Sequence, residues 1–363
     1  MKAFIVPFII FFALSCQTLE HNEQLPETTF PHSLSYFIPL DNDHLALWGG
    51  VFDEETNSPN IINVIHKRTG VWEPRSLNIP ENLTSTLVMK NHNRTAIFGG
   101  KTQSNKYNSV LWLVQDNRWT SLKLPITSRT YAGGCYTNNE IIIFGGQNKQ
   151  GKKLSDGVIY DIRSGVVHKI SLPGMNLRSH TVHCSDEEVL FIGGRTKKGV
   201  TNAITMLDLT RIKPKKMNTP MKPSINQAIT RYKKKMFFYG GRQSSKVVHN
   251  DMWKWDLESK KWQRIQHPIP SGRTDMNQFV YKNYWILMHG KGVITQSFND
   301  IFVFDLASEK WITPRQNKSC ASPRFGHAFH YQNKKIYIAG GLDNGHMQKD
   351  GCVMELMEIL NDR

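Results

Sequence analysis

Glycine pairs, or the remnant of one, recur along this chain at nearly constant intervals. They are Gly49-Gly50, Gly99-Gly100, Gly145-Gly146, Gly193-Gly194, Gly240-Gly241, the degraded His289-Gly290 and Gly340-Gly341. From second glycine to second glycine, the intervals are 50, 46, 48, 47, 49 and 51 residues. A fixed period of this length indicates a supersecondary unit that is repeated and stacked on its neighbours. The chain is therefore constrained to a repeat architecture.

The residues around each glycine pair predict a hairpin followed by two more strands. In one unit the polar turn 137–140 leads into the apolar run 141–144, which is typical of the second strand of a β-hairpin. After the glycines, a variable loop leads into a third strand, and a tryptophan opens a fourth strand in several units. These tryptophans are Trp72, Trp119, Trp262 and Trp311. No segment after the N-terminal leader has helical periodicity of convincing length.

The glycine pair and the spaced tryptophan resemble the kelch repeat, and the resemblance covers nearly all of the chain after residue 30. It implies an all-β fold, a seven-bladed β-propeller with four antiparallel strands per blade, as one domain over residues 32–363. The last unit has a third strand near 352–360 and then ends. We therefore expect residues 16–31 to supply its fourth strand and close the ring, which removes exposed sheet edges. The alternative is a polar N-terminal tether.

The first fifteen residues predict an export signal. Lys2 is followed by the apolar run 4–14, which is too short to span a bilayer as a mature helix. The run ends in Ala13-Leu14-Ser15-Cys16, which resembles a bacterial lipobox with Ala13 and Leu14 exchanged. We expect a signal peptide over 1–15, a lipid on Cys16, and a location in the periplasm, the outer membrane or the cell surface. The alternative is simple secretion, with Cys16 available to pair with Cys352.

Four further cysteines, Cys135, Cys184, Cys320 and Cys352, do not demand disulfides. Cys135 and Cys184 each follow an arginine by six residues, so we expect them at equivalent places on adjacent blades, too far apart to bridge. A ring with a large core is stable without cross-links, so both are interpreted as small apolar fillers. No spacing of cysteine and histidine indicates zinc, and no motif indicates a cofactor. We expect no metal and no cofactor.

Positive charge is concentrated in the middle of the chain. The whole chain has a net charge of +16, and residues 148–246 contain 20 lysines and arginines against 6 aspartates and glutamates. This basic sector predicts contact with an anionic surface, or alternatively a solvated cationic surface without a partner. Because no nucleic-acid-binding module is present and the chain is expected to be exported, we do not expect nucleic acid to be the partner.

Four units begin their inner strand with an arginine, Arg129, Arg178, Arg273 or Arg324. Ring geometry is expected to bring these arginines towards the central mouth on the face that bears the long loops. The residues that follow them closely and share this mouth are Tyr131, His180, Asp275 and His327. Such a set predicts charge-assisted binding of a carboxylate or another acidic group. The alternative is that each arginine caps strand ends and carbonyls within its own blade.

These features predict a monomeric binding or scaffold protein of the cell envelope, whose ligand is a protein, an acidic small molecule or a glycan. In kelch proteins that bind other proteins, this face and its arginines often make the contact, so the resemblance favours the site. The second hypothesis is a periplasmic sugar mutarotase or isomerase resembling the sialic acid epimerases, in which Asp275 and His180 transfer a proton. No catalytic motif appears elsewhere in the chain, so the sequence favours binding over catalysis.

Overall fold

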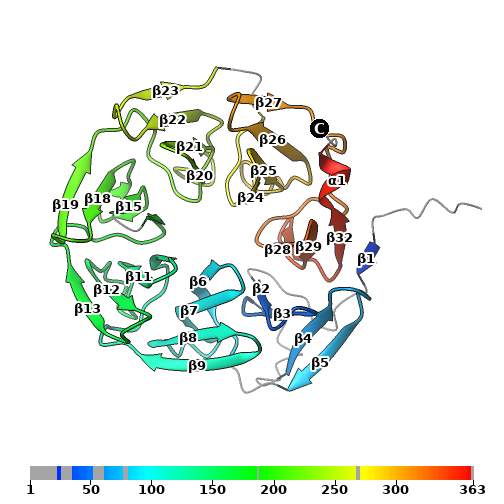
Figure 1. Ribbon diagram of the computed structural model, residues 1–363, viewed down its shortest axis with the longest axis horizontal. Coiled ribbons are helices and arrows are strands. Elements are labelled where there is room, and N and C mark those ends of the chain that lie inside the picture. The colour runs from blue at the N-terminus through cyan, green and yellow to red at the C-terminus, as the bar shows by residue number, and fades with distance from the viewer. Residues whose placement is uncertain are drawn as a thin grey trace, which may run out of the picture.

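Seven four-stranded antiparallel sheets are arranged as blades around a central axis (Figure 1). The computed structural model describes residues 23–25, 35–51, 61–76, 81–185, 188–266 and 270–360. The prediction of a seven-bladed propeller with four antiparallel strands per blade is confirmed. Residues 1–22, which include the predicted signal peptide and Cys16, lie outside the described residues.

Blades 1, 2 and 3 follow chain order from the inner to the outer strand. Blade 1 contains β2 (Tyr36–Pro39), β3 (His44–Trp48), β4 (Ile61–His66) and β5 (Trp72–Ser76). Blade 2 contains β6 (Thr84–Asn91), β7 (Arg94–Lys101), β8 (Val110–Gln115) and β9 (Arg118–Lys123). Blade 3 contains β10 (Gly133–Tyr136), β11 (Glu140–Phe144), β12 (Asp156–Asp161) and β13 (Val167–Ser171).

Blades 4, 5 and 6 repeat this order. Blade 4 contains β14 (Thr181–Cys184), β15 (Glu188–Ile192), β18 (Ile204–Asp208) and β19 (Lys213–Met217), with the hairpin β16 (Arg195–Thr196) and β17 (Gly199–Val200) in its long loop. Blade 5 contains β20 (Ala228–Tyr232), β21 (Lys235–Tyr239), β22 (Met252–Asp256) and β23 (Trp262–Arg264). Blade 6 contains β24 (Asn277–Tyr281), β25 (Tyr284–Met288), β26 (Ile301–Asp305) and β27 (Lys310–Ile312).

The seventh blade joins the two ends of the ring. It contains β28 (Ala328–Gln332), β29 (Lys335–Ala339), β32 (Gly351–Glu355) and β1 (Glu23–Leu25), with the hairpin β30 (Leu342–Asp343) and β31 (His346–Met347) in its long loop. β1 pairs antiparallel with β32, with Gln24 opposite Cys352. The N-terminal segment therefore supplies the closing strand, as predicted, and the alternative of an unpaired tether is wrong for these three residues.

A single helical turn, α1 (Leu356–Ile359), replaces the end of the strand predicted over 352–360. Leu356 and Ile359 are three residues apart and both are buried in the core cluster between blades 6 and 7. Three-residue spacing brings two side chains to one face in a helix but to opposite faces in a strand, so burial of both favours the helix. In the described part of the chain, no helix is long and apolar enough to cross a membrane.

Among the described residues, the hydrophobic core is divided into seven clusters, and each cluster fills the interface between two neighbouring blades. One cluster joins Phe37 and Leu47 of blade 1 to Tyr337 and Ala339 of blade 7, which seals the ring. The tryptophans that open the outer strands of blades 1, 2, 5 and 6 are partly buried against such clusters. Stacking of sheet faces around the ring therefore supplies the burial that one blade alone cannot provide.

The glycine pairs bring the backbone of one blade against the next. Gly99 and Gly100 have φ values of +71° and +83°, in the left-handed region that favours glycine. The N–H of Gly100 donates to the carbonyl of Arg129 in the next blade at 2.8 Å, and a Cβ at residue 99 would clash with that carbonyl. Equivalent bonds join Gly50 to Leu83, Gly146 to Leu177, Gly194 to Ser224 and Gly241 to Arg273.

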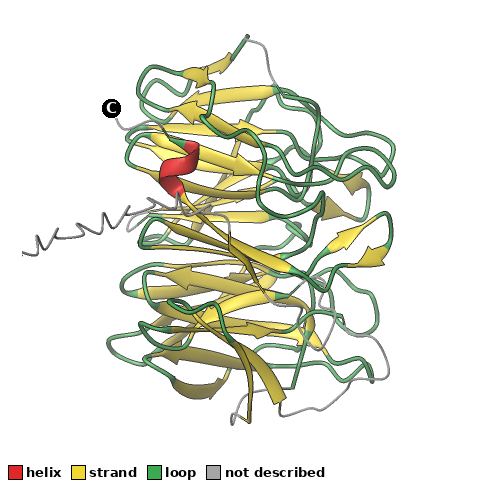
Figure 2. Ribbon diagram, turned by 90° about the vertical axis from the view of Figure 1, so that its right-hand side faces the viewer, coloured by secondary structure: helices red, strands yellow, loops and turns green. Residues whose placement is uncertain are grey.

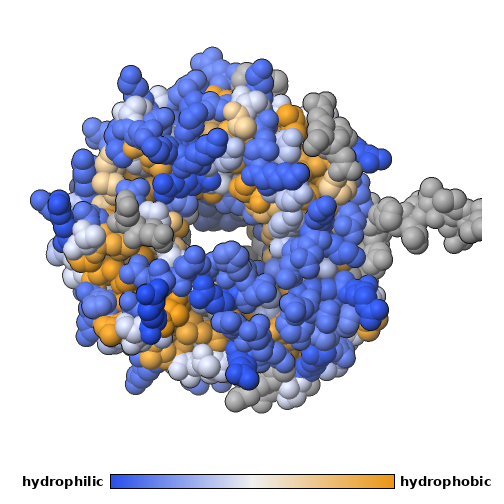
Figure 3. All heavy atoms as spheres, in the orientation of Figure 1, coloured by the Kyte–Doolittle hydropathy of each residue, from blue (hydrophilic) through white to orange (hydrophobic). Residues whose placement is uncertain are grey.

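The two faces of the ring differ in the length of their loops. In blades 2 to 7, the loops that follow the second strand extend on the right-hand side in Figure 2, whereas α1 and the short turns lie on the left. We call these the long-loop face and the short-turn face. Figure 3 shows the short-turn face, where mostly hydrophilic residues surround the central opening.

Candidate functional site

Six blades place one residue with a left-handed backbone where the inner strand begins on the long-loop face. These residues are Ser85, Tyr131, Ser179, Asn226, Asp275 and Gly326, with φ between +52° and +63°, and we call them the mouth residues. Three backbone bonds link neighbours in this set: Tyr131 N to Ser85 O at 3.1 Å, Ser179 N to Tyr131 O at 2.9 Å, and Asp275 N to Asn226 O at 3.2 Å. Strained backbone that tertiary structure holds in place is common at binding sites, so the mouth is the candidate site.

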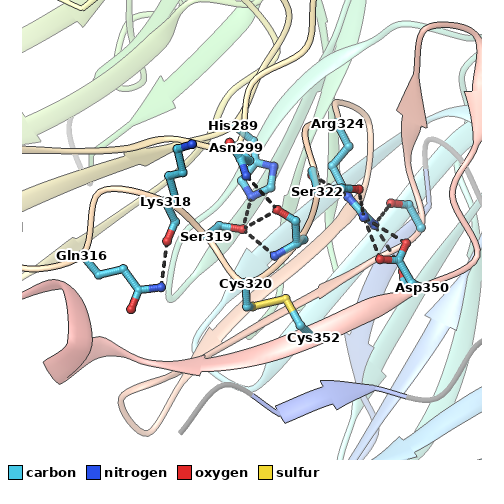
Figure 4. The surroundings of a disulfide bond; sticks show 12 residues. His289, Asn299, Gln316, Lys318, Ser319, Cys320, Ser322, Arg324, Asp350 and Cys352 are labelled. Atoms are coloured by element: carbon cyan, nitrogen blue, oxygen red, sulfur yellow. Dashed lines mark hydrogen bonds and ion pairs between the residues drawn. A yellow bond between two sulfur atoms is a disulfide. The ribbon is translucent and has the colours of Figure 1, made fainter. Parts of the chain in front are cut away.

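Three of the four predicted arginines are buried beneath this mouth. The side chains of Arg129, Arg273 and Arg324 are 0%, 1% and 0% exposed. Each guanidinium forms an ion pair with an aspartate at the start of the third strand of its own blade or directly before it. Figure 4 shows this arrangement for Arg324, which donates to both oxygens of Asp350 at 2.9 Å. For these three arginines, the alternative to anion binding therefore holds, because each one caps strand ends within its own blade.

The buried arginines also donate to backbone oxygens. Nη1 of Arg129 lies 3.0 Å from the Gly145 carbonyl, and Nη1 of Arg324 lies 3.0 Å from the Gly340 carbonyl. The partner aspartates Asp156, Asp300 and Asp350 follow their arginines by 27, 27 and 26 residues. This nearly constant spacing was present in the sequence and could have identified the pairs, because it links the same two positions in three of the repeats.

Arg178 occupies a different position from the other three arginines. In blade 3, the carbonyl of Arg129 accepts the N–H of Gly100 from the preceding blade. In blade 4, the equivalent bond comes from the N–H of Gly146, and its acceptor is the carbonyl of Leu177, not of Arg178. Leu177 therefore stands where blades 3, 6 and 7 have the buried arginine. Ala203 stands where those blades have the aspartate. Its carbonyl accepts the N–H of Gly193, just as the carbonyl of Asp156 in blade 3 accepts the N–H of Gly145. Blade 4 lacks both members of the pair, and Arg178 is displaced by one residue towards the mouth.

Arg178 and Tyr131 form a partly exposed pair at the mouth. The guanidinium lies over the tyrosine ring, 5.1 Å from its centroid. Tyr131 is 41% exposed, whereas Arg178 is half-buried. Nε of Arg178 is buried without a hydrogen-bond partner among the described residues, and no carboxylate there pairs with the guanidinium. A cation stacked on an aromatic ring and lacking a counter-ion is suited to bind an anionic group.

The other predicted site residues are distributed around the mouth. Asp275 is half-buried; it accepts a hydrogen bond from Nδ2 of Asn226 at 2.5 Å and lies 3.7 Å from Arg242. His180 is buried between the rings of Phe144 and Phe191 rather than exposed at the mouth. The structure therefore places Asp275 on the mouth and His180 beneath it.

His327 is also buried, and it contacts Asn277 and His289. Burial lowers the pKa of His180 to about 4, so this imidazole is neutral at pH 7. Burial together with the positive charge of Arg324 lowers the pKa of His289 to about 3, and burial lowers that of His327 well below its ordinary value. Neutral buried imidazoles are poor ligands for an anion, so neither His180 nor His327 adds charge to the site.

Sequence reasoning missed four polar residues at the mouth. Ser85, Ser179 and Asn226 are mouth residues, and Arg242 lies beside Asp275. A left-handed conformation at serine or asparagine gives no signal in the sequence, because neither residue requires it. Only the alignment of the blades in space identifies these positions.

The mutarotase hypothesis is not favoured by this geometry. It required a ring of arginines to hold an acidic sugar, but three of those guanidiniums are buried against aspartates. It also required Asp275 and His180 to exchange a proton with a sugar, and His180 is enclosed by aromatic rings. Within the described residues, no group of three or more His, Cys, Asp or Glu side chains could hold a metal ion.

The prediction for Cys135 and Cys184 is wrong, because these residues form a disulfide with a Cα–Cα distance of 6.1 Å. The prediction counted six residues from Arg129 and from Arg178, and these two arginines are not equivalent. In the strand register, Cys135 pairs with Ile142, and the residue in the same place of blade 4 is His183. Cys184 is one residue further on. Since successive side chains of a strand alternate between faces, Cys135 and Cys184 point towards each other across the blade interface.

The second disulfide joins Cys320 to Cys352, with a Cα–Cα distance of 6.0 Å (Figure 4). It connects the segment that enters blade 7 to β32, the strand that pairs with the closing strand β1. Because Cys352 is bonded to Cys320, the alternative pairing of Cys352 with Cys16 is wrong. The interpretation of Cys135 and Cys184 as small apolar fillers is likewise corrected, because they are bridged to each other.

Two large hollows lie away from the mouth. One, of about 710 Å³, is lined by residues 315–318 and by side chains of β32 and α1. The other, of about 500 Å³, lies at the short-turn ends of the inner strands of blades 2 to 4 and includes Lys90, His183 and the Cys135–Cys184 disulfide. The sequence did not indicate either hollow.

A family model described as the KLHDC2/KLHL20/DRC7 Kelch-repeats domain matches the chain in three overlapping stretches, residues 31–211, 116–287 and 176–341. Acyl-CoA-binding domain-containing protein 5 of Arabidopsis thaliana is 24% identical over 92% of this chain and 58% of its own length. Acyl-CoA-binding domain-containing protein 4 of the same plant is 26% identical over 67% of this chain and 40% of its own length.

A third relative, putative protein tag-53 of Caenorhabditis elegans, is 22% identical over 83% of this chain and 21% of its own length. The chain therefore spans between about a fifth and three fifths of these relatives. What the matches share with it is the repeat region, so the likeness concerns the propeller and not the remaining parts of those proteins.

Proposed function

The chain belongs to the kelch-repeat family, and we propose that it is a protein-binding scaffold whose partner docks on the mouth of the long-loop face. The observation that carries this proposal is the Arg178–Tyr131 pair, in which a guanidinium with no counter-ion among the described residues lies on an exposed aromatic ring. Tyrosine and arginine, together with tryptophan, are enriched among the residues that contribute most binding energy at protein interfaces. A rigid ring that presents them at its centre is a suitable frame for a partner.

The partner group that fits Arg178 is a carboxylate, either a chain end or an acidic side chain. A planar guanidinium recognises a carboxylate through two parallel hydrogen bonds, and Tyr131 limits its orientation. Asp275, 97 residues further along the chain on the same mouth, adds a negative group. We expect it to favour a partner that also carries a donor or a positive charge and so to contribute to specificity.

Photo-crosslinking tests the docking site. A benzophenone amino acid at position 131 is expected to form an adduct with the partner in cells that produce the protein. The matched control is position 166, because Val166 belongs to the same blade and is 46% exposed, compared with 41% for Tyr131, but lies on the short-turn face. The adduct at position 131 should be lost with Arg178→Ala. Adducts at position 166 alone, or an adduct at 131 that persists in Arg178→Ala, would contradict the proposal.

We also propose that the chain is exported and carries a lipid on Cys16, so that residues 1–15 form a signal peptide and 32–363 the propeller. Two observations support this proposal: the apolar leader of the sequence and the two disulfides. Disulfides persist mainly in oxidising compartments, outside the cytosol. In a bacterial host, the ring would be located in the periplasm or at the cell surface. Mass spectrometry of the mature N-terminus tests this, since an unmodified Cys16 or an uncleaved leader would contradict it.

A further inference from the structure

Four neighbouring loops on the long-loop face form a basic surface. They follow the glycine pairs of blades 3 to 6 and comprise residues 147–156, 195–203, 242–251 and 291–300, all of which are described. We call them the basic loop surface. They contain nine basic residues: Lys149, Lys152, Lys153, Arg195, Lys197, Lys198, Arg242, Lys246 and Lys291. They contain three acidic residues, Asp156, Asp251 and Asp300.

The three aspartates do not neutralise these cations. Asp156 and Asp300 pair with the buried arginines of their own blades, and Asp251 pairs with Lys222 and Arg264. Five lysines of the basic loop surface are exposed and form no ion pair with a described residue: Lys149, Lys152, Lys197, Lys198 and Lys246. Their charge is therefore available to an external anionic surface.

Aliphatic side chains protrude from the same loops. Val247, Val293 and Ile294 are 44%, 46% and 61% exposed, although β-branched aliphatic residues are usually buried. The N–H of Ile294 donates to the carbonyl of Ser245 at 2.9 Å, which ties the loops of blades 5 and 6 together. Ile294 has φ +55°, a conformation that a β-branched residue rarely adopts. Strain and exposure together indicate that Ile294 is held at the surface by the fold.

This composition is unlike a surface built for protein or nucleic acid. Protein interfaces are depleted in lysine and enriched in tyrosine, tryptophan and arginine, whereas every exposed cation in these loops is lysine. Single-stranded nucleic acid is bound by stacking on aromatic rings, but Val247, Val293 and Ile294 are aliphatic. An anionic membrane surface attracts lysines that lie beside protruding aliphatic side chains. The lipid headgroups bind the ammonium groups, and the aliphatic side chains insert at the boundary between headgroups and acyl chains.

We propose that the basic loop surface docks on an anionic lipid bilayer. Lys149, Lys152, Lys197, Lys198 and Lys246 contact the headgroups, and Val247, Val293 and Ile294 enter the interface. Docking in this way does not depend on a lipid at Cys16 or on a partner at the mouth. Because the loops belong to the long-loop face, the docked ring holds its mouth beside the bilayer.

Vesicle flotation tests this with the full chain carrying Cys16→Ser, so that no acyl chain contributes. Vesicles of phosphatidylcholine alone are compared with vesicles that also contain phosphatidylglycerol. We expect binding only to the second kind and its loss at high salt. Lys197→Gln with Lys198→Gln should weaken binding about 25-fold, or about fivefold for each lysine. Val293→Ser with Ile294→Ser should weaken it about tenfold.

The matched control is Lys215→Gln with Lys216→Gln. These lysines belong to the same blade and are also exposed, but they lie on the outer strand β19. The two control substitutions remove the same charge from the whole chain as Lys197→Gln with Lys198→Gln. They should change vesicle binding less than about twofold. Thermal unfolding of all three variants should match that of the parent protein, because every changed side chain is exposed.

Three outcomes would overturn the proposal. The first is equal binding to both kinds of vesicle, and the second is an equal loss with the control lysine pair. The third is retention on heparin or DNA that depends on Lys197 and Lys198, combined with vesicle binding that is unaffected by Val293→Ser and Ile294→Ser. That last result would assign the surface to an anionic polymer instead of a bilayer.

Discussion

The guanidinium of Arg178 lies over the ring of Tyr131, 5.1 Å from its centroid, at the mouth of the long-loop face. Arg129, Arg273 and Arg324 are instead buried against aspartates. One repeated residue type therefore has two roles. Three copies hold their blades together, and the fourth, displaced by one residue, faces the mouth.

Arg178→Ala is expected to abolish partner binding without destabilising the ring. Removal of the only mouth guanidinium that lacks a counter-ion among the described residues should weaken binding at least about tenfold. Because the interaction with Tyr131 is partly exposed, the free energy of unfolding should fall by less than about 1 kcal/mol. Affinity is measured with the crosslinked partner once it is identified, and stability by chemical denaturation. A large loss of stability would show that Arg178 is structural like the others.

Arg324→Ala is expected to lower the free energy of unfolding by about 3 kcal/mol, because it leaves Asp350 and buried carbonyls without their donor. Asp350 is 37% exposed, so solvent compensates part of the loss. Denaturation in urea measures the change. The control is Arg118→Ala on the outer strand β9, which is exposed and should change stability by less than about 0.5 kcal/mol. Similar effects at both positions would contradict a structural role for the buried pair.

Replacing Cys320 and Cys352 by serine is expected to lower stability by about 3 to 4 kcal/mol, because the bridge closes a loop of 32 residues in the unfolded chain. The comparison is the parent protein with and without reductant, measured by denaturation. Non-reducing peptide mapping should recover Cys320–Cys352 and Cys135–Cys184 as the two linked pairs. A peptide that links Cys16 to Cys352 would contradict the structure.

Acid is expected to destabilise the ring through its buried histidines. The pKa of His180 is about 4 in the folded state and about 6.5 when unfolded, so the unfolded state binds more protons below pH 6.5. Stability is therefore complete above pH 6.5 and falls as the pH decreases towards 4. Between pH 7.5 and 5, His180 should account for about 2 kcal/mol of this loss.

The variant His180→Leu tests the assignment. Its loss of stability between pH 7.5 and 5 should be about 2 kcal/mol smaller than that of the parent protein. The measurement is the free energy of unfolding at the two pH values. His168→Leu is the control, because His168 is exposed on the outer strand β13 and should leave the difference unchanged. An equal pH dependence in the parent and in His180→Leu would refute the role of this histidine.

Most of the fold could be predicted because its signals are local and repeated. The glycine pairs, the hairpin turns and the spaced tryptophans each occur within one unit, and seven copies in register leave one architecture. The closing role of the N-terminal segment also followed, since the last unit lacks a fourth strand. The candidate site was harder to predict, because it depends on how residues of different blades meet.

The sequence by itself determined the number of blades, the strands in each and the face on which each loop lies. Tertiary structure alone decided which arginines are buried, which cysteines are bridged and which residues surround the mouth. The reason is the alternation of side chains along a strand, in which a shift of one residue reverses the face. Blade 4 contains such a shift, so Arg178 is not equivalent to Arg129, and Cys184 faces Cys135. Equal spacing in the sequence could not reveal it, because the spacing from arginine to cysteine is six residues in both blades.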